Sequence, residues 1–283
     1  MIGKPLEVIA LRHQPRKRFG QNFLQDDAVI ASIARAINPA ADDHIVEIGP
    51  GEGALTSELI RSDCRLDAIE LDRDLKTRLL ASFSVHPGFS LHSADALSFD
   101  FESLRRHDVP LRIVGNLPYN ISTPLIFKLL ESGQHIADMH FMLQREVVDR
   151  LAAQPGTKEW GRLGVMAQFQ CEIEKLFEVP PEAFFPPPKV QSAVVRLIPR
   201  AINPWPHCDR TRLAAVVARA FAQRRKTLQN NFKGFLEAGD LEAHGINPSL
   251  RAEALELDQF IALATINNQE SSRVGLDTLD DAR

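Results

Sequence analysis

Residues 46–55, which read VEIGPGEGAL, constrain the fold of this chain more than any other stretch. Residues 44–48 are rich in apolar and β-branched side chains, as in a short buried strand, and residues 54–61 have the apolar spacing of a helix. The tight turn between them contains three glycines, Gly49, Gly51 and Gly53. Glycine accepts positive φ and lets the backbone approach a ligand, while the start of the helix offers unpaired N–H groups. The stretch therefore predicts a cradle for a nucleotide-like ligand.

Two classes of enzyme use a turn of this kind, and the turn alone leaves both open. Gly49, Gly51 and Ala54 match the G-x-G-x-x-A pattern of nicotinamide dehydrogenases. Glu47 before the first glycine and the third glycine, Gly53, are instead similar to the first motif of S-adenosylmethionine-dependent methyltransferases. In that motif the turn holds the amino-acid and ribose end of a ligand that has no pyrophosphate.

Two acids follow the next two predicted strands. The second strand, residues 65–69, ends at Glu70, and the third, residues 89–92, leads to Asp95. An acid about 20 residues beyond the glycines accepts the ribose hydroxyls in doubly wound folds, and Glu70 has this spacing. Asp95 could accept a hydrogen bond from the exocyclic amine of the cofactor's adenine. Taken singly, either acid would also suit a loop or a helix cap.

The fourth predicted strand, residues 111–114, leads into the sequence NLPY. An aminopurine nitrogen is a poor nucleophile because its lone pair is delocalised into the ring, so its methylation needs acceptors that hold its N–H bonds. Asn116 offers its side-chain oxygen and Leu117 its backbone carbonyl, while Pro118 restricts Leu117 to extended geometry. Tyr119 offers an aromatic face on which a base can stack. This tetrapeptide favours methyl transfer to an adenine over hydride transfer.

Several motifs, taken in order, resemble those of the ribosomal RNA adenine dimethyltransferases. They are residues 21–24 (QNFL), 47–53 (EIGPGEG), Glu70, Asp95 with Ala96, 116–122 (NLPYNIS), 177–181 (FEVPP), 184–190 (FFPPPKV) and 192–197 (SAVVRL). The resemblance covers residues 14–235. It implies that S-adenosylmethionine supplies four methyl groups to two adjacent adenines in a hairpin loop near the 3′ end of small-subunit rRNA. The implied partner is an immature small ribosomal subunit.

The resemblance also implies roles for individual residues. Cofactor contacts are expected from Asn22, Leu24, Gly49, Gly51, Glu70, Asp95, Ala96 and Asn116. Catalytic and target-adenine contacts are expected from Asn116, Leu117, Pro118, Tyr119 and Phe184. A second aromatic residue, Phe185, and a triple proline depart from the family pattern, so either phenylalanine could stack on the base, and Phe184 is preferred.

These elements predict an α/β fold with a doubly wound, mostly parallel, seven-stranded Rossmann-like sheet in residues 1–200. Its last two strands are expected to close the sheet edge in antiparallel fashion. Prolines near residue 200 mark a linker, and helical apolar spacing predicts a small all-α domain in residues 201–266. Residues 154–162 are expected to form a mobile loop that carries Trp160 near the substrate entrance. The polar, acidic tail, residues 267–283, is expected to be disordered.

Nucleic-acid binding must depend on local charge, because 33 basic and 37 acidic residues give a net charge of −4. Residues 210–236 contain seven basic residues and no acid. The seven are Arg210, Arg212, Arg219, Arg224, Arg225, Lys226 and Lys233. This patch predicts phosphate binding by the helical domain. A second basic run, residues 12–18, is typical either of a solvated arm or of an arm that meets phosphates.

Other features bound the remaining possibilities. Cys64, Cys171 and Cys208 are odd in number and scattered, which favours reduced thiols and no metal site. The chain shows no signal-peptide core and no long apolar run, so a cytoplasmic protein with no membrane partner is expected. One cofactor site per chain makes a monomer sufficient. Two alternatives stay open: an adenine methyltransferase that acts on another RNA, such as large-subunit rRNA, and an assembly or transcription factor that has lost catalysis.

Overall fold

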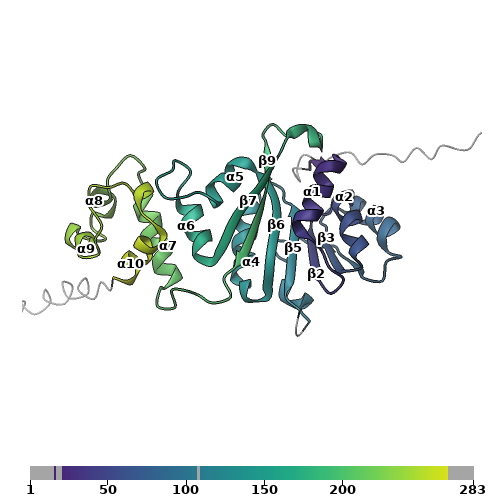
Figure 1. Ribbon diagram of the computed structural model, residues 1–283, viewed down its shortest axis with the longest axis horizontal. Helices are drawn as coiled ribbons and strands as arrows, with labels where there is room; N and C mark the ends of the chain where they lie inside the picture. Colours follow the sequence, from purple (N-terminus) through teal and green to yellow (C-terminus); the bar gives the residue numbers. More distant parts are fainter. Residues whose placement is uncertain (1–15, 17–20, 107–108, 267–283) are drawn as a thin grey trace, which may run out of the picture. The chain divides into compact units, whose positions relative to one another are not determined.

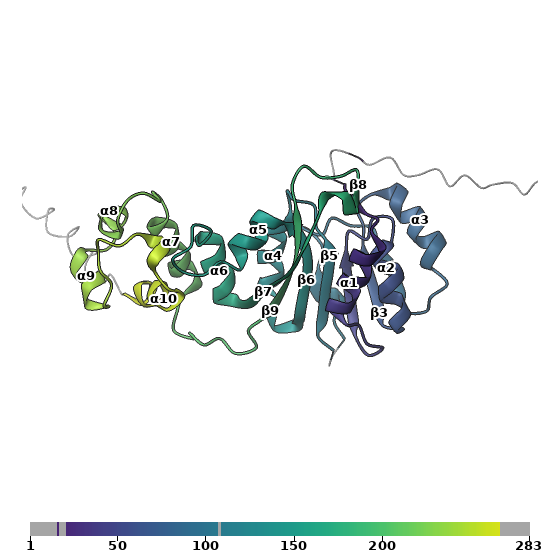
Figure 2. The same cartoon turned by 45° about the horizontal axis from the view of Figure 1, so that its top comes forward.

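The structure, a computed structural model, describes Arg16 and residues 21–106 and 109–266. It divides into two compact units, each shown in Figures 1 and 2. The first unit comprises Met1–Asp149 and Gln170–Ala201, and the second comprises Arg150–Phe169 and Ile202–Arg283. Apart from Arg16, the predicted basic arm lies outside the described residues, as does the predicted acidic tail.

The first unit is built on a seven-stranded sheet with the strand order β4-β3-β2-β5-β6-β9-β7. The strands are β2 (His44–Ile48), β3 (Arg65–Ile69), β4 (Phe89–His92), β5 (Leu111–Asn116), β6 (Ile136–Gln144), β7 (Cys171–Val179) and β9 (Ser192–Pro199). Strands β2 to β6 pair in parallel, whereas β9 runs antiparallel to both β6 and β7. The predicted doubly wound, mostly parallel sheet with an antiparallel edge is confirmed.

Helices connect several of the parallel strands: α2 (Ala54–Leu59), α3 (Arg73–Phe83) and α4 (Ser122–Glu131). Helix α1 (Asp27–Ile37) precedes β2, and α5 (Arg145–Leu151) follows β6. The Asp26 carboxylate accepts hydrogen bonds from two backbone N–H groups at the start of α1, and the Asp72 carboxylate accepts one at the start of α3. Apolar residues of α1, α2 and α3 pack on one face of the sheet, while α4 lies behind the sheet in Figure 1.

A two-stranded antiparallel sheet joins two segments that are distant in sequence, β1 (Phe23–Leu24) and β8 (Phe184–Phe185). Leu24 pairs with Phe184, and both side chains belong to the core of the first unit. Phe23 pairs with Phe185. Because successive side chains of a strand point to opposite faces, Phe23 and Phe185 lie on the face that is turned away from this core.

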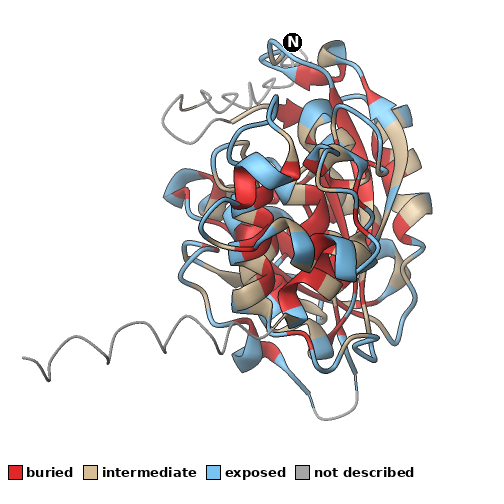
Figure 3. Cartoon of the chain, turned by 90° about the vertical axis from the view of Figure 1, so that its left-hand side faces the viewer, coloured by how far each residue is buried: buried red, intermediate tan, exposed pale blue. Residues whose placement is uncertain are grey.

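The second unit contains only helices among its described residues. They are α6 (Arg162–Gln170), α7 (Arg210–Ala220), α8 (Leu228–Phe232), α9 (Ala238–Ala243) and α10 (Leu257–Thr265). The predicted apolar face of α7, which includes Leu213, Val216 and Val217, is fully buried. The rings of Phe221 and Phe260 stack with their centroids 5.6 Å apart. In Figure 3 the buried segments of the helices face inward and the exposed segments face outward.

Residues 150–169 belong to the second unit, although the predicted division at residue 200 places them in the first. The indole N–H of Trp160 donates a hydrogen bond of 2.9 Å to the carbonyl of Leu255, and the Gly156 N–H donates one of 2.7 Å to the carbonyl of Glu253. Trp160 is only 1% exposed. It is therefore a core residue of the second unit, in a loop that these two hydrogen bonds join to residues 253–255.

None of the described helices has the length and the apolar character that crossing a membrane requires. Within the described ranges, no group of three or more His, Cys, Asp or Glu side chains is arranged to hold a metal ion. Cys64, Cys171 and Cys208 are buried free thiols. Burial raises the pKa of the Cys171 thiol to about 12, so this thiol stays protonated at neutral pH.

Candidate active site

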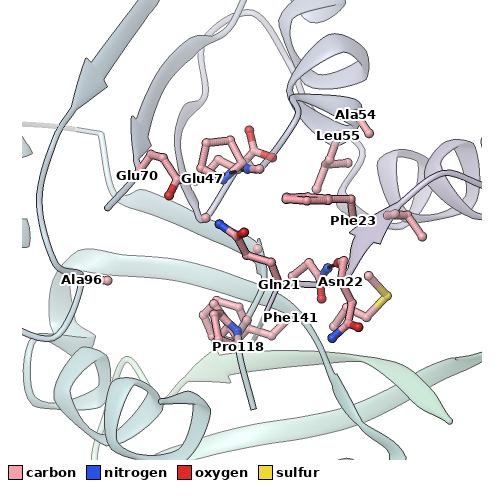
Figure 4. Close-up of a pocket in the computed structure, with 18 of the residues that line it drawn as sticks. Gln21, Asn22, Phe23, Glu47, Ala54, Leu55, Glu70, Ala96, Pro118 and Phe141 are labelled. Atoms are coloured by element: carbon pink, nitrogen blue, oxygen red, sulfur yellow. Dashed lines mark hydrogen bonds between the residues drawn. The ribbon is translucent and has the colours of Figure 1, made fainter. Parts of the chain in front are cut away.

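A cavity of about 350 Å³ lies at the carboxyl ends of the parallel strands of the first unit (Figure 4). Ligands bind at this edge in open α/β sheets. The cavity brings together all the predicted site residues except Phe184. These are Asn22, Leu24, Gly49, Gly51, Glu70, Asp95, Ala96, Asn116, Leu117, Pro118 and Tyr119.

The glycine turn between β2 and α2 forms one wall of the cavity. Gly49, Gly51 and Gly53 have φ values of 67°, 61° and 87°, which disfavour other residues. Space requires glycine as well, because a Cβ on Gly53 would lie 2.5 Å from the ring of Phe83, and one on Gly51 would lie 3.0 Å from the ring of Phe23. Backbone conformation and packing thus require glycine in this turn, and Gly49 and Gly51 line the cavity.

Glu70 connects the end of β3 to the glycine turn. One carboxylate oxygen accepts a hydrogen bond of 2.8 Å from the Asp72 N–H, and the other accepts one of 3.3 Å from the Gly51 N–H. Burial raises the pKa of Glu70 above its usual value. Each carboxylate oxygen can accept a second hydrogen bond. Glu70 can therefore receive ribose hydroxyls while it holds the turn in place.

Glu47 lies under the same turn, on β2, and is almost fully buried. The Thr56 hydroxyl of α2 donates a hydrogen bond of 2.6 Å to the Glu47 carboxylate. Burial raises the pKa of Glu47 to about 7, against the opposing effect of this hydrogen bond. Glu47 thus fixes helix α2 to the strand before it, a function that the sequence motif alone does not indicate.

Asp95 and Ala96 lie in the loop that follows β4. One Asp95 carboxylate oxygen accepts a hydrogen bond of 2.9 Å from the Leu97 N–H, which closes a local turn. The other oxygen has no hydrogen-bond partner among the described residues, so it can accept a donor from a ligand. Ala96 contributes a small apolar surface to the cavity wall.

Asn116 and Leu117 place two oxygen acceptors at the end of β5. The Asn116 side-chain N–H₂ donates a hydrogen bond of 3.0 Å to the carbonyl of Asn22, and the Leu117 N–H donates one of 3.2 Å to the carbonyl of Met142. These bonds use one side-chain N–H of Asn116 and the backbone N–H of Leu117. The Asn116 side-chain oxygen and the Leu117 carbonyl oxygen have no hydrogen-bond partner within the described part of the chain.

Tyr119 is the only tyrosine of the chain and lines the same cavity. Its hydroxyl lies 3.2 Å from the hydroxyl of Ser192, a buried residue at the start of β9. Its carbonyl accepts a hydrogen bond of 3.2 Å from the Ser122 hydroxyl, which belongs to the first turn of α4. The ring is therefore fixed at both ends, with part of its surface accessible.

Phe184 is the one predicted site residue that the structure does not bring to the cavity. It is 5% exposed and packs in the core with Leu24, Ile33 and Val179. Phe185 is 42% exposed. The pairing of β8 with β1 explains the difference, because Phe184 shares the buried face of this small sheet with Leu24.

The cavity also contains residues that sequence reasoning missed, among them Leu55, His140, Phe141 and Met142. In Figure 4, Phe23 and Leu55 lie on one side of the cavity, and Glu70 and Ala96 lie on the other. His140 and Phe141 lie inside a long apolar strand, β6, where no sequence signal separates them from other core residues. Burial lowers the pKa of His140 to about 4, so its imidazole is neutral at pH 7.

A model of the family described as "Ribosomal RNA adenine dimethylase" matches residues 12–269 of this sequence. The chain belongs to the ribosomal RNA adenine dimethylase family. Proteins named "Ribosomal RNA small subunit methyltransferase A" are similar to this dimethylase over most of its length. The one from Saccharophagus degradans is 56% identical over 252 residues, which are 89% of this chain and 94% of that protein. The one from Pseudomonas aeruginosa is 56% identical over 253 residues, again 89% and 94%.

Two solved structures resemble the dimethylase over most of its length. The 23S rRNA methyltransferase ErmE has 28% sequence identity and a TM-score of 0.69, with 86% of this chain and 98% of that chain covered. A dimethyladenosine transferase from Plasmodium falciparum has 24% identity and a TM-score of 0.72, with 85% and 95% covered. The second likeness shows the fold alone.

S-adenosylmethionine is the methyl donor of the dimethylase, and the cavity fits this ligand. Gly49 and Gly51 of the turn line the cavity, Glu70 can receive hydroxyls, and Asp95 has an unpaired acceptor oxygen. Apolar surface from Leu55 and Leu71 can cover the flat face of a base. When bound, the cofactor supplies a methyl group on a positively charged sulfur.

Proposed function

We propose that this dimethylase transfers methyl groups to the exocyclic amines of two adjacent adenines in the 3′-terminal hairpin loop of small-subunit rRNA, within an immature small subunit. The names of relatives that are 56% identical over nearly their whole length support this target. The observation that carries the chemistry is the pair of unpaired acceptor oxygens, from Asn116 and Leu117, in the cavity that also contains Glu70 and Asp95.

For the cofactor, we assign the ribose hydroxyls to Glu70 and the adenine amine to Asp95. The backbone of the glycine turn, with Asn22 and Leu24 across from it, then holds the amino-acid end. Ala96 contacts the adenine, and Asn116 borders the sulfur. The acceptor oxygens of Asn116 and Leu117 would hold the target amine beside the methyl group that the cofactor supplies.

The target amine is activated by the way it is held. The oxygens of Asn116 and Leu117 accept its two N–H bonds, which favours a tetrahedral nitrogen whose lone pair can attack. Pro118 keeps Leu117 extended, and Tyr119 stacks on the purine. The bound cofactor would supply the methyl group as its sulfonium becomes a neutral thioether, and the nitrogen would take up the positive charge. It then loses a proton to water, so no strong base is required.

The target adenine must leave its helical stack, because a paired and stacked amine cannot reach a site at the bottom of a cavity. The monomethylated product keeps one N–H bond for one of the two acceptors. Its methyl group needs space beside Asn116 and Tyr119 for the second transfer.

We propose that RNA phosphates bind a subset of the seven basic residues of the second unit. Residues 222–226 are all exposed, and they include Arg225 and Lys226. Arg212 instead lies over the ring of Phe235, 4.5 Å from its centroid, and Arg219 donates a hydrogen bond of 2.8 Å to the carbonyl of Lys233. The exposed residues should therefore contribute more to RNA binding than Arg212 and Arg219, which contact other residues of the protein. Replacing both Arg225 and Lys226 by alanine should weaken subunit binding and reduce its salt dependence.

We propose that the enzyme acts in the cytoplasm, where small subunits are assembled, and that it works as a monomer. The support for a monomer is that one chain supplies a complete set of cavity residues. The proposed chemistry needs neither a metal ion nor a membrane.

The test combines the purified protein, labelled S-adenosylmethionine and small subunits from cells that lack a dimethylase. Nucleoside mass spectrometry should detect N6,N6-dimethyladenosine, and primer extension should map it to two neighbouring adenines of the 3′-terminal hairpin. Modification of large-subunit rRNA instead would contradict the proposed target. Binding of subunits with no methylation would favour the assembly-factor alternative.

A further inference from the structure

The loop that follows β4 is held from behind by one lysine of helix α4. The Lys128 ammonium donates hydrogen bonds to three backbone carbonyls, those of Ala96 at 3.3 Å, Leu97 at 2.8 Å and Phe99 at 2.6 Å. A lysine ammonium has three N–H donors and no acceptor. The loop therefore satisfies every donor of Lys128, and Lys128 brings three carbonyl oxygens together at one point.

Aromatic packing supports the same arrangement. The Lys128 ammonium lies 5.5 Å from the centroid of the Phe101 ring, within range of a cation–π interaction. The Phe99 ring makes edge contacts with the rings of His92 and Phe101, with centroids 5.4 Å and 5.3 Å apart. His92, at the end of β4, is fixed by a 2.6 Å hydrogen bond to the Asp67 carboxylate. Both ends of the loop are thus anchored.

This anchored loop carries two of the residues assigned to the cofactor's adenine, Asp95 and Ala96. The Asp95 carboxylate is oriented by the Leu97 N–H, and the carbonyls of Ala96 and Leu97 are bound by Lys128. Three carbonyl dipoles that converge without a cation would repel one another and lose their hydrogen bonds. Without Lys128, the loop should therefore relax and move the free oxygen of Asp95.

We propose that Lys128 is a positioning residue for recognition of the cofactor's adenine. It holds the loop of residues 95–99 so that Asp95 meets the exocyclic amine, although Lys128 itself lines no part of the cavity. This inference rests on the proposed placement of the adenine at Asp95. Helix α4 begins directly after the segment that holds the target base, so one helix supports both the cofactor's base and the substrate's base.

The test compares S-adenosylhomocysteine with S-inosylhomocysteine, in which a carbonyl replaces the adenine amine, as ligands in isothermal titration calorimetry. The wild-type protein should bind the adenosyl ligand more tightly. Lys128→Met should raise the Kd for the adenosyl ligand about tenfold, because charge-assisted hydrogen bonds are lost, and should raise the Kd for the inosyl ligand much less. Lys128→Arg keeps the charge and should recover most of the discrimination.

Lys76→Met on helix α3 is the matched control, because Lys76 is a partly exposed helix lysine outside the cavity, and it should behave as wild type. Steady-state methylation should show KM for the cofactor rising more than kcat falls in Lys128→Met. Equal weakening of both ligands, or no change in either, would overturn the inference. If the wild-type protein itself does not distinguish the two ligands, the adenine is not at Asp95, and the assignment of the site fails together with the inference.

Discussion

The cavity has a cofactor half, which contains the glycine turn, Glu70 and Asp95, and a base half, which contains residues 116–119. The two halves are constructed in different ways. In the cofactor half, the key hydrogen bonds join residues that are close in sequence: Gly51 to Glu70 spans 19 positions, and Thr56 to Glu47 spans 9. In the base half, the bond from Asn116 to Asn22 spans 94 positions, and the contact of Tyr119 with Ser192 spans 73. The part of the cofactor half around the glycine turn thus forms within successive strand–helix units, whereas the base half needs distant segments of the first unit to come together.

This contrast predicts two kinds of mutational effect. Changes to the long-range contacts of the base half should impair methyl transfer, or the fold that supports it, while cofactor affinity is preserved. Changes to the buried carboxylates of the cofactor half should alter cofactor affinity or the pH dependence of stability. The predictions below are ordered by the size of the expected effect.

The largest effect is expected for Phe184→Ala, because Phe184 belongs to the core on which the base half is assembled. Truncating a buried phenylalanine costs about 3–5 kcal/mol of unfolding free energy. Phe185→Ala is the matched control and should change stability by less than about 0.5 kcal/mol, because Phe185 is largely exposed. Urea denaturation measures both. A Phe184→Ala variant that is stable but inactive would indicate that Phe184 contacts the target base.

Asn116→Ala should follow, with a turnover about 10² to 10³ times slower, as expected when one acceptor of a reacting group is removed. Binding of S-adenosylhomocysteine and of the small subunit should change far less. Asn116→Asp keeps an acceptor oxygen but loses the N–H that bonds to the carbonyl of Asn22. Its rate should therefore lie between those of wild type and Asn116→Ala. Single-turnover methylation at saturating cofactor measures these rates, and full turnover by Asn116→Ala would exclude Asn116 from the chemistry.

The same contrast explains how much of the site the sequence could predict. Gly49, Glu70, Asp95 and Asn116 each lie at or shortly after the end of a strand whose pattern is visible locally, and the ends of parallel strands meet at one edge of a sheet. Their convergence therefore follows from local patterns and a single topological rule. The strand and helix positions of the first unit were predictable for the same reason.

The residues that could not be predicted depend on contacts between distant segments. In the run FFPPP, nothing local indicates which phenylalanine is buried, because the pairing of β8 with β1 decides it. His140 lies in an apolar strand and reaches the cavity only through the packing of the first unit. Trp160 is placed in the second unit by its hydrogen bond to Leu255, almost 100 residues later in the sequence. No local sequence pattern indicates these long-range contacts.

In the cofactor half, ionisation of Glu47 should make stability depend on pH, with a free-energy change of similar size. Its pKa rises from 4.5 in the unfolded chain to about 7 in the folded protein. Between these values the folded state binds more protons than the unfolded state, so stability should fall as pH rises from about 4.5 to 7, and the full cost is present above 7. The fall should be on the order of 3 kcal/mol.

Glu47→Gln keeps the shape of the side chain but cannot ionise, so the variant should lose this slope. Urea denaturation of wild type and variant at pH 5 and pH 8 gives a double difference in which the contributions of other groups cancel. Glu70 also titrates at a raised pKa and repels the ionised Glu47, so the double difference reports Glu47 together with this repulsion. If the unfolding free energies of wild type and variant instead change equally with pH, ionisation of Glu47 does not destabilise the fold.

The smallest effect should come from the other long-range contact of the base half, that of Ser192 with Tyr119. Ser192→Ala removes one hydrogen bond, worth about 1 kcal/mol, so methylation should slow about fivefold while the Kd for S-adenosylhomocysteine stays unchanged. Because Tyr119 is the only tyrosine, ¹³C-labelled tyrosine gives one phenol carbon signal in NMR, and this signal should shift in the variant. Ser192→Thr restores a hydroxyl and should restore both readouts. A shifted signal with an unchanged rate would mean that packing alone orients the ring, and the base half would then depend less on its long-range hydrogen bonds than the Asn116 contact suggests.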